Sequence, residues 1–325
     1  MIAKKRTKPL KLMKLEVLNE RIVQNHSKMQ FIESDFAKYN AGFKGEMSLD
    51  FYMKDLNEDD YHIFHDLRLP QSSNEQFYFQ IDTLIVHSQF CVLIEVKNLI
   101  GNLYFDHQFD QIIRTRDGVD ETFSDPINQV ALQKVQFAKW LRLNKFPEIP
   151  LHTLVAITNP KSYIRISPKY GKKSQKIIRG NTLVNKIYGY VSTQQENVLL
   201  KKDLKRLTKY LIREDTPHNP DILKNYNIKR EEILTGVFCP KCNTPPMIRI
   251  KRTWVCLNCS EESNDAHEKA LQDYALLFNP QVKNRDIRDF LNIESRSSVK
   301  KLLHSMNLKP IGSRKAAIYT LPFPK

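Results

Sequence analysis

The sequence predicts a mixed α/β fold in its larger part, followed by a small metal-binding element and a helical C-terminal module. Four short runs rich in Phe, Tyr, Ile and Val have the composition of β-strands. These runs are residues 61–70, 77–86, 90–99 and 101–106. Asp125 and Pro126 then favour a helix to about Leu143, because Asp is a good N-cap and Pro suits the first helical position. Residues 151–159 are apolar and predict another buried strand, so helices and strands alternate as in an α/β domain.

Composition divides the chain of 325 residues into five consecutive segments. A basic leader comes first, and the α/β domain that follows begins with a helical stretch from Asp35 to Leu56. A polar segment with several prolines then separates this domain from the C-terminal part. The expected segments are residues 1–34 (basic arm or helix), 35–215 (α/β domain), 216–235 (linker), 236–262 (zinc ribbon) and 263–325 (C-terminal module).

The basic residues are unevenly distributed along the chain. The formal net charge is +15, from 51 Lys and Arg against 36 Asp and Glu. Between Lys161 and Arg213 there are 14 basic residues and two acidic ones, Glu196 and Asp203. This density predicts nucleic acid as the partner, because neutralising phosphates releases counterions and supplies most non-specific affinity. The alternative is a solvated basic surface that keeps the protein soluble. The sequence leaves open whether the protein is a homo-oligomer.

The chain carries no sign of membrane insertion or export. No run approaches the roughly 18 apolar residues that span a bilayer, so no membrane partner is expected. The basic N-terminus lacks the apolar core and cleavage site of a secretory signal, and it lacks the Ser and Arg enrichment of a transit peptide. We therefore expect a cytoplasmic protein. In that compartment two CxxC pairs among five cysteines indicate metal binding rather than disulfides.

The most informative segment is QFYFQIDTLIVHSQFCVLIEVKNLIG, in which two apolar strands flank a polar turn at Ser88 and Gln89. If the hairpin turns there, the numbers of facing residues sum to 177, and Asp82 lies opposite Glu95. Directly paired residues of antiparallel strands project from the same face, with Cβ atoms about 5 Å apart. Period-two alternation then places Lys97 on that face beside Glu95. Two carboxylates and a lysine thus converge from strands that are otherwise almost wholly apolar.

Two adjacent carboxylates in apolar surroundings repel each other, and burial makes their charged forms costly. A divalent cation removes both problems, and Mg²⁺ (or Mn²⁺) prefers carboxylate oxygens together with waters and phosphate oxygens. Such an ion can activate a bound water, and Lys97 can orient or deprotonate that water or balance developing negative charge. The alternative is structural: Glu95 and Lys97 form a salt bridge at the strand end, and Asp82 is an ordinary polar residue.

QID-TLIV, VLIEVKN and the Gly that follows resemble the core of the nuclease-related domain, a branch of the PD-(D/E)xK restriction-endonuclease-like superfamily. The segment Gly42-x-x-Gly45-Glu46 is similar to the GxxGE element of that family, and Asp125-Pro126-x-x-Gln129 to its PxxQ element. The resemblance covers residues 35–159. It implies a restriction-endonuclease-like mixed sheet flanked by helices, and a metal-dependent nuclease activity.

The resemblance also implies roles for individual residues. Asp82 and Glu95 would hold the metal, and Lys97 would be the catalytic lysine. Glu46 would be an additional acidic ligand or a supporting group, and Gln129 would point from its helix toward the site. The alternatives are a helix-initial acid for Glu46 and a solvated helix residue for Gln129.

Three positions depart from the family pattern, although none of them removes a metal ligand. Thr83 follows Asp82 where many relatives have His, and Asp125 replaces the usual Asn before Pro. The turn at residues 88–90 lacks the Gly that is common there. Outside the motifs, we expect Cys91 to be a packed small apolar residue. We expect His87 to lie at the surface.

The second informative segment is FCPKCNTPPMIRIKRTWVCLNC, in which two CxxC pairs are separated by 13 residues. Four thiolates complete a closed tetrahedral Zn²⁺ site, and the strand-like residues between the pairs are typical of a zinc ribbon. The predicted ligands are Cys239, Cys242, Cys256 and Cys259. With no open position for water the zinc would be structural. Basic residues at 249, 251 and 252 could contact phosphate, and Trp254 could stack on a base or cover the small core.

Residues 284–321 predict helix, turn, helix and a basic hairpin, which resembles a winged helix-turn-helix module. Asn284 and Ser295 are the expected caps of the two helices. In that geometry four residues at the start of the second helix would face a DNA groove. They are Ser297, Ser298, Lys300 and Lys301. The alternative is a dimerisation or packing element.

Together these features predict a Mg²⁺-dependent nuclease that hydrolyses phosphodiester bonds, mainly in DNA, for processing, repair or defence. One alternative is a protein that binds nucleic acid through a nuclease-like core without cutting it. Another is an enzyme directed at RNA, because zinc ribbons and basic grooves serve both polymers.

Overall fold

The computed structural model describes residues 1–57, 59–71, 77–194, 196–312 and 317–323. Contacts divide the chain into two compact units. The first, the sheet unit, is formed by residues 1–7 and 39–218, and the second, the cysteine unit, by residues 8–38 and 219–325. The first residues of the basic leader belong to the sheet unit and the rest to the cysteine unit. In the described part of the chain, no helix is both long enough and apolar enough to cross a membrane.

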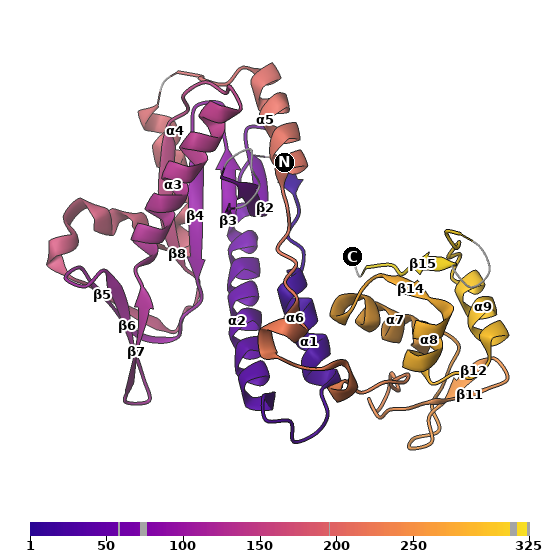
Figure 1. Cartoon of the computed structure of the whole chain (residues 1–325). Helices are drawn as coiled ribbons and strands as arrows, with labels where there is room; N and C mark the ends of the chain where they lie inside the picture. The colour runs from indigo at the N-terminus through magenta and orange to yellow at the C-terminus, as the bar shows by residue number, and fades with distance from the viewer. Residues whose placement is uncertain (58, 72–76, 195, 313–316, 324–325) are drawn as a thin grey trace. The chain divides into compact units, whose positions relative to one another are not determined.

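A six-stranded mixed sheet forms the centre of the sheet unit (Figure 1), in the order β1-β2-β3-β4-β8-β10. Its strands are β1 (Ile2–Lys4), β2 (His62–Pro70), β3 (Tyr78–Val86), β4 (Cys91–Lys97), β8 (Leu151–Ile157) and β10 (Ile177–Arg179). The pairs β2–β3 and β3–β4 are antiparallel, and β1–β2, β4–β8 and β8–β10 are parallel. The predicted mixed sheet is confirmed, and β1 adds a strand that the leader did not reveal.

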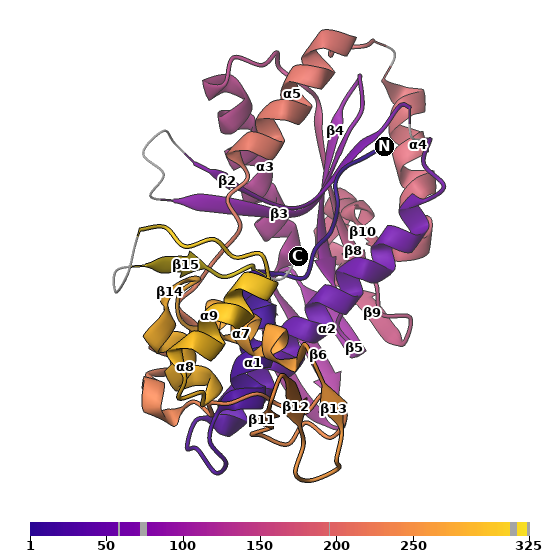
Figure 2. The same cartoon turned by 90° about the vertical axis from the view of Figure 1, so that its right-hand side faces the viewer.

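Helices cover both faces of this sheet (Figure 2). One face packs against α2 (Met29–Met53) and α4 (Leu183–Thr193), through residues such as Leu49 and Ile187. The other packs against α3 (Pro126–Leu143) and α5 (Lys201–Glu214), through residues such as Phe137 and Leu207. Because both faces are covered, β4 is apolar at nearly every position instead of alternating.

A second sheet of four strands, in the order β7-β6-β5-β9, leads from β4 into α3. Its strands are β5 (Gly101–Asp106), β6 (Gln111–Arg116), β7 (Val119–Ser124) and β9 (Ser162–Ile166). The chain then enters α3 at the predicted cap, where the Asp125 carboxylate accepts the Ile127 N–H at 2.8 Å. The Tyr170 hydroxyl donates to the other oxygen of Asp125 at 2.9 Å, which fixes the start of the helix. Short 3₁₀ helices at Pro168–Lys176 and Gly180–Thr182 complete the unit.

The cysteine unit is mainly helical, with two short antiparallel sheets. Its helices are α1 (Leu10–Arg21), α6 (Ile222–Tyr226), a 3₁₀ turn (Arg230–Glu232), α7 (Ala266–Leu277), α8 (Asn284–Leu291) and α9 (Arg296–Ser305). Its strands are β11 (Ile248–Ile250), β12 (Thr253–Val255), β13 (Glu262–Ser263), β14 (Gln281–Lys283) and β15 (Ile318–Thr320). The segment expected as a linker contains α6 and the 3₁₀ turn, and Ile233 forms a β-bridge with Ile22 after α1.

The two predicted helix caps of the C-terminal module have different outcomes. Ser295 caps α9, because its hydroxyl accepts the Ser298 N–H at 3.2 Å. The prediction for Asn284 is wrong by one position: α8 starts at Asn284, and the preceding Lys283 N–H donates to the Asp286 carboxylate at 2.8 Å. Residues 313–316 of the predicted basic hairpin lie outside the described residues.

Candidate active site

The two predicted carboxylates lie where strands β3 and β4 part. Residues 83–86 of β3 pair with residues 91–94 of β4 in the predicted register, in which facing numbers sum to 177. The ladder ends one position before Asp82 and Glu95. In its place the Asp82 carboxylate accepts the backbone N–H of Val96 at 2.9 Å. A side chain therefore bridges the two strands at the point where their backbones stop pairing.

The pairing of β2 with β3 is irregular at the same place, because the ladder skips Asp66 and Asp82. Side chains of a regular strand point alternately to opposite faces of the sheet. Ile81 and Leu84 lie three positions apart and yet pack in the same core cluster, so the alternation shifts at Asp82. Across the pair in β2, Asp66 has a φ of 51°, in the left-handed region that few non-glycine residues adopt. The sheet thus opens at Asp82 while its apolar side chains stay in the core.

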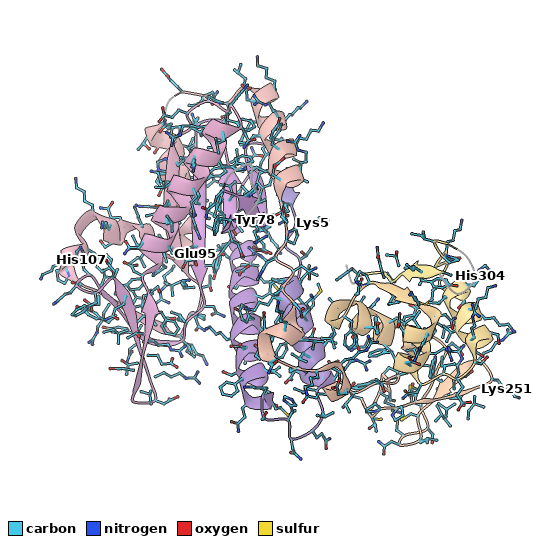
Figure 3. The ribbon with its side chains drawn as sticks, viewed as in Figure 1. Lys5, Tyr78, Glu95, His107, Lys251 and His304 are labelled. Atoms are coloured by element: carbon cyan, nitrogen blue, oxygen red, sulfur yellow. The ribbon has the colours of Figure 1, made fainter. Side chains whose placement is uncertain are left out.

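Glu95 is buried, with 2% of its surface exposed, and both of its oxygens have partners. Oε1 accepts a hydrogen bond from the Lys97 ammonium at 2.7 Å, and Oε2 accepts one from the Gln133 amide at 2.8 Å. Lys97 also donates to Gln129 Oε1 at 3.1 Å. Figure 3 shows Glu95 on β4, beside α3, which carries both glutamines. Lys97 thus links Glu95 of its own strand to Gln129 of α3.

Gln133 was missed from the sequence. It lies one helical turn after Gln129 and therefore on the same face of α3. Its side chain is 6% exposed, and its Oε1 atom has no hydrogen-bond partner among the described residues. The i, i+4 spacing from Gln129 was the available signal.

Glu46 reaches the site from α2 because of a glycine. A Cβ atom at Gly45 would lie 2.3 Å from the Cβ of Asn98, just beyond β4, so only glycine allows this approach of helix and strand end. Asn98 in turn donates to the carbonyl of Ala41 in α2 at 2.7 Å. Glu46 lies well inside α2, so it is not the helix-initial acid of the alternative interpretation.

Carboxylate repulsion and burial dominate the electrostatics of the site. Burial, with the charges of Glu95 and Glu46, raises the pKa of Asp82 well above its usual value, although its side chain keeps some solvent contact. Burial also raises the pKa of Glu46 to about 7, against the opposing attraction of Arg6. The site therefore favours protons or a cation over bare carboxylates.

Arg6, which was also missed, supports this site from the N-terminal segment. Its side chain is 4% exposed and donates from Nη1 to Glu46 at 2.5 Å, and from Nε and Nη2 to Asp50 at 2.9 and 3.1 Å. Nη2 also donates to the Thr83 hydroxyl at 3.0 Å and lies 2.8 Å from Nδ1 of His65. Burial, assisted by Arg6, lowers the pKa of His65 to about 4, so this ring is neutral near pH 7 and can accept from the guanidinium.

The donor set fits a Mg²⁺ or Mn²⁺ ion that retains waters. Asp82 and Glu95 offer hard carboxylate oxygens, and such ions are commonly held by one or two carboxylates with waters and phosphate oxygens. Within the described part of the chain, Glu46 does not join them in a group of three whose ligand atoms all lie within 4.8 Å. The position of Glu46 therefore suits an acidic group beside the metal ligands better than a third metal ligand.

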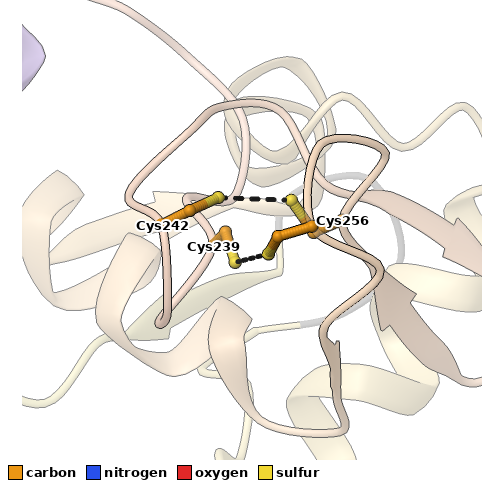
Figure 4. A group of neighbouring side chains, drawn as sticks. Cys239, Cys242 and Cys256 are labelled. Carbon is orange, nitrogen blue, oxygen red and sulfur yellow. Dashed lines mark hydrogen bonds between the residues drawn. The ribbon is translucent and has the colours of Figure 1, made fainter.

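The four predicted cysteines form a second candidate metal centre, within the cysteine unit. The four sulfur atoms all lie within 4.8 Å of one another. In the described part of the chain, no other group of three or more His, Cys, Asp or Glu side chains has its ligand atoms this close together. The sulfurs of Cys239 and Cys259 are 3.6 Å apart, and those of Cys242 and Cys256 are 3.5 Å apart (Figure 4). A disulfide needs about 2.05 Å, whereas tetrahedral zinc with bonds of about 2.3 Å places its sulfurs about 3.8 Å apart. The cluster can hold a zinc ion.

Strands β11 and β12 form the expected hairpin between the two CxxC pairs. Trp254 on β12 is 1% exposed and donates from its indole nitrogen to His267 Nδ1 at 3.1 Å. It therefore covers the core of the ribbon and is not available to stack on a base. Arg249 lies against its ring, 5.1 Å from the centroid, while Lys251 and Arg252 are exposed.

Two other predictions on single residues have clear outcomes. Cys91 is fully buried in β4, and burial raises the pKa of its thiol, so it is a packed residue as predicted. The surface position predicted for His87 is wrong: it is 9% exposed and lies between the rings of Tyr61 and Phe90, with both centroids 5.0 Å away.

Comparison with known protein families finds a match for one segment of the chain. Residues 41–158 match the model of the nuclease-related domain family. The matched segment includes Glu46, Asp82, Glu95, Lys97 and Gln129. No curated protein matches the chain. Among solved structures the chain is similar to the crystal structure of protein VC1899 from Vibrio cholerae, with 12% identity and a TM-score of 0.25. That similarity covers 63% of this chain and 53% of the other, and it is too weak to carry a conclusion.

Proposed function

We propose that the protein is a metal-dependent nuclease that hydrolyses phosphodiester bonds in DNA. The observation that carries this proposal is the arrangement of Asp82, Glu95 and Lys97 at the opening between β3 and β4, inside a segment that matches a nuclease-related domain. A salt bridge alone would explain Glu95 and Lys97. It would not explain why two further carboxylates, those of Asp82 and Glu46, lie where burial and neighbouring charges disfavour their ionised forms.

Each side chain has a distinct task in the proposed reaction. Asp82 and Glu95 hold the metal ion, which supplies an activated water and neutralises negative charge on the phosphate. Lys97 lies beside Glu95, and its ammonium is positioned to orient the attacking water or to balance charge that develops on phosphate oxygens. Gln129 holds the Lys97 ammonium, and Gln133 holds the Glu95 carboxylate.

Substrate binding is assigned to basic surfaces and to the cysteine unit. The density of Lys and Arg in residues 161–213 supplies attraction for a phosphate backbone. Helices α8 and α9 with strands β14 and β15 have the element order of a winged helix, in which α9 would approach a DNA groove. The four cysteines hold structural zinc and thereby order the ribbon that precedes this module.

The test is a cleavage assay with supercoiled, linear, single-stranded and branched DNA and with RNA, each with and without Mg²⁺ or Mn²⁺. Glu95→Gln keeps the size of the side chain but removes the metal-binding charge, so we expect cleavage to fall by at least about a hundredfold, the order lost when a charge-stabilising group is removed. Glu148→Ala, at an exposed position, is the control and should cut normally.

Three results would contradict the proposal. Unchanged cleavage in Glu95→Gln would show a contaminant or a different site. Tight binding without cleavage of any substrate would support a non-catalytic nucleic-acid-binding protein. Cleavage restricted to RNA would replace DNA by RNA as the substrate.

A further inference from the structure

A basic hollow of about 550 Å³ lies within the cysteine unit, between α8, α9 and the strand pair β14–β15. Its wall contains five cationic residues, and the described residues that line it include no acid. The cations are Lys283, Arg285, Arg288, Arg296 and Lys300. The remaining described wall residues are Asn284, Pro310, Gly312, Ala317 and Tyr319. We call this feature the cationic pocket.

Two of these cations have partners that neutralise little of their charge. Arg285 lies 3.6 Å from Asp289, but both side chains are largely exposed, and pairs of that kind are worth little. Arg288 uses Nη1 to reach the Glu294 carbonyl at 3.2 Å. Its Nε atom is buried without a hydrogen-bond partner among the described residues. This buried donor can serve an acceptor oxygen, because buried polar groups are normally hydrogen-bonded.

Two helices begin at the pocket, which adds to its attraction for anions. Asn284 opens α8 and Arg296 opens α9, and the Asn284 amide donates to the Arg296 carbonyl at 3.2 Å. Both helix starts therefore lie side by side in the wall. Each contributes the positive end of a helix dipole, which favours negative charge at that position.

The size and apolar wall of the pocket limit what can enter it. A volume of about 550 Å³ lies within the range of small-molecule sites, which is about 300–1,000 Å³. Pro310, Ala317 and Tyr319 give one part of the wall an apolar surface. The pocket thus combines a cluster of cationic side chains with a surface suited to a sugar or base.

We propose that the cationic pocket binds the terminal phosphate of a nucleic-acid strand. A terminal phosphate monoester carries about −1.5 to −2 charges near neutral pH, whereas each internal diester carries one. Five cations with two helix starts therefore favour the monoester. A strand end can also place its phosphate in this hollow while the rest of the strand stays outside, whereas an internal phosphate requires the strand to enter and leave it.

This inference rests on the proposed nucleic-acid substrate, but its test does not depend on cleavage. The full-length protein, with zinc retained and without added Mg²⁺ or Mn²⁺, is titrated into labelled short oligonucleotides of one sequence. These carry a 5′-phosphate, a 3′-phosphate or hydroxyls at both ends, and binding is followed by fluorescence anisotropy. We expect one phosphorylated form to bind about tenfold more tightly than the hydroxyl form, as a few charge-assisted hydrogen bonds allow.

The matched variants are Lys300→Glu, in the pocket, and Lys301→Glu, its exposed neighbour on α9 outside the wall. Both change the charge equally. We expect Lys300→Glu to abolish the preference for the phosphorylated end and Lys301→Glu to keep it, even if overall affinity falls. Lys300→Gln is a milder second variant, and thermal melting of all three confirms folding.

Several results would overturn the inference. One is equal affinity for phosphorylated and hydroxyl ends, and another is an equal loss of preference in Lys300→Glu and Lys301→Glu. If a mononucleotide or inorganic phosphate displaces the oligonucleotide when both are present at the same concentration, the pocket is assigned to a free phosphate compound instead. If the protein cuts DNA but binds phosphorylated and hydroxyl ends equally, only this inference is refuted. If it prefers phosphorylated ends but never cuts, only the proposed nuclease activity is refuted.

Discussion

Arg6 donates a hydrogen bond of 2.5 Å from Nη1 to the carboxylate of Glu46, which joins the segment after β1 to the middle of α2. The same guanidinium also binds Asp50 and the Thr83 hydroxyl beside Asp82. A residue of the basic leader is thus part of the support of the candidate active site. Its charge opposes the burial that raises the pKa of Glu46 to about 7.

The first prediction concerns Arg6 and the pH dependence of cleavage. If Glu46 acts in its ionised form, activity rises as pH increases through about 7. Arg6→Gln removes the attraction that favours the carboxylate, so the rise should move to higher pH, and a move of one pKa unit would lower the rate at pH 7 about fivefold. The measurement is a pH–rate profile, with the exposed Lys5→Gln as control. A lower rate at every pH with an unshifted profile would mean that Arg6 has only a structural role.

The second prediction concerns stability in the absence of divalent ions. Glu46 has a folded-state pKa of about 7 against an ordinary value of 4.5, so folding favours its protonated form. Its contribution to stability is fully present below about pH 4.5 and is lost as pH rises through about 7. Burial raises the pKa of Asp82 as well, which acts in the same direction.

We therefore expect the melting temperature of the protein without Mg²⁺ to fall as pH rises through about 7, and Glu46→Gln to flatten this dependence. Added Mg²⁺ should stabilise the protein most on the alkaline side, because the metal competes with protons for the carboxylates. Thermal melts with zinc retained measure both effects. Stability that rises with pH across this window, or Mg²⁺ stabilisation that is equal at all pH values, would contradict the assignment.

The third prediction concerns Gln133, which holds Glu95 at 2.8 Å from α3. Groups that orient a metal ligand typically contribute about 10- to 100-fold to metal affinity or activity. Gln133→Leu should therefore raise the Mg²⁺ concentration for half-maximal cleavage by at least about tenfold. Gln136→Leu, on the same helix, is the matched control. If Gln133→Leu lowers the maximal rate but leaves the Mg²⁺ dependence unchanged, Gln133 does not act through the metal ligand.

The hairpin shows how much of this site could be predicted from sequence. Two apolar runs around a polar turn define one register, and the observed pairing of residues 83–86 with residues 91–94 is that register. The cap at Asp125 and the four cysteines were predictable for a similar reason, since each depends on residues close in sequence. Local chemistry carries these features, so it is visible without a structure.

Features that depend on distant residues were not predictable. β1 has three residues and pairs in parallel with a strand about sixty positions later, so no periodic pattern marks it or Arg6. The irregular pairing at Asp66 and Asp82 depends on both strands together. His87 and Trp254 were misplaced or left open because ring packing, rather than local polarity, decides their burial.

The fourth prediction separates structural zinc from the proposed catalytic metal. Four sulfurs at the spacing of a tetrahedral site should bind about one Zn²⁺ per chain, and Cys259→Ser should lose it. Cys91→Ala, which alters the remaining cysteine, should keep the metal. Because Trp254 packs beside the cluster, zinc loss should change its fluorescence, measured in a Trp140→Phe background so that Trp254 is the reporter. Zinc binding in Cys259→Ser equal to that of the parent chain would refute the four-thiolate site. Loss of zinc with unaltered Trp254 fluorescence would show that the metal does not order the ribbon.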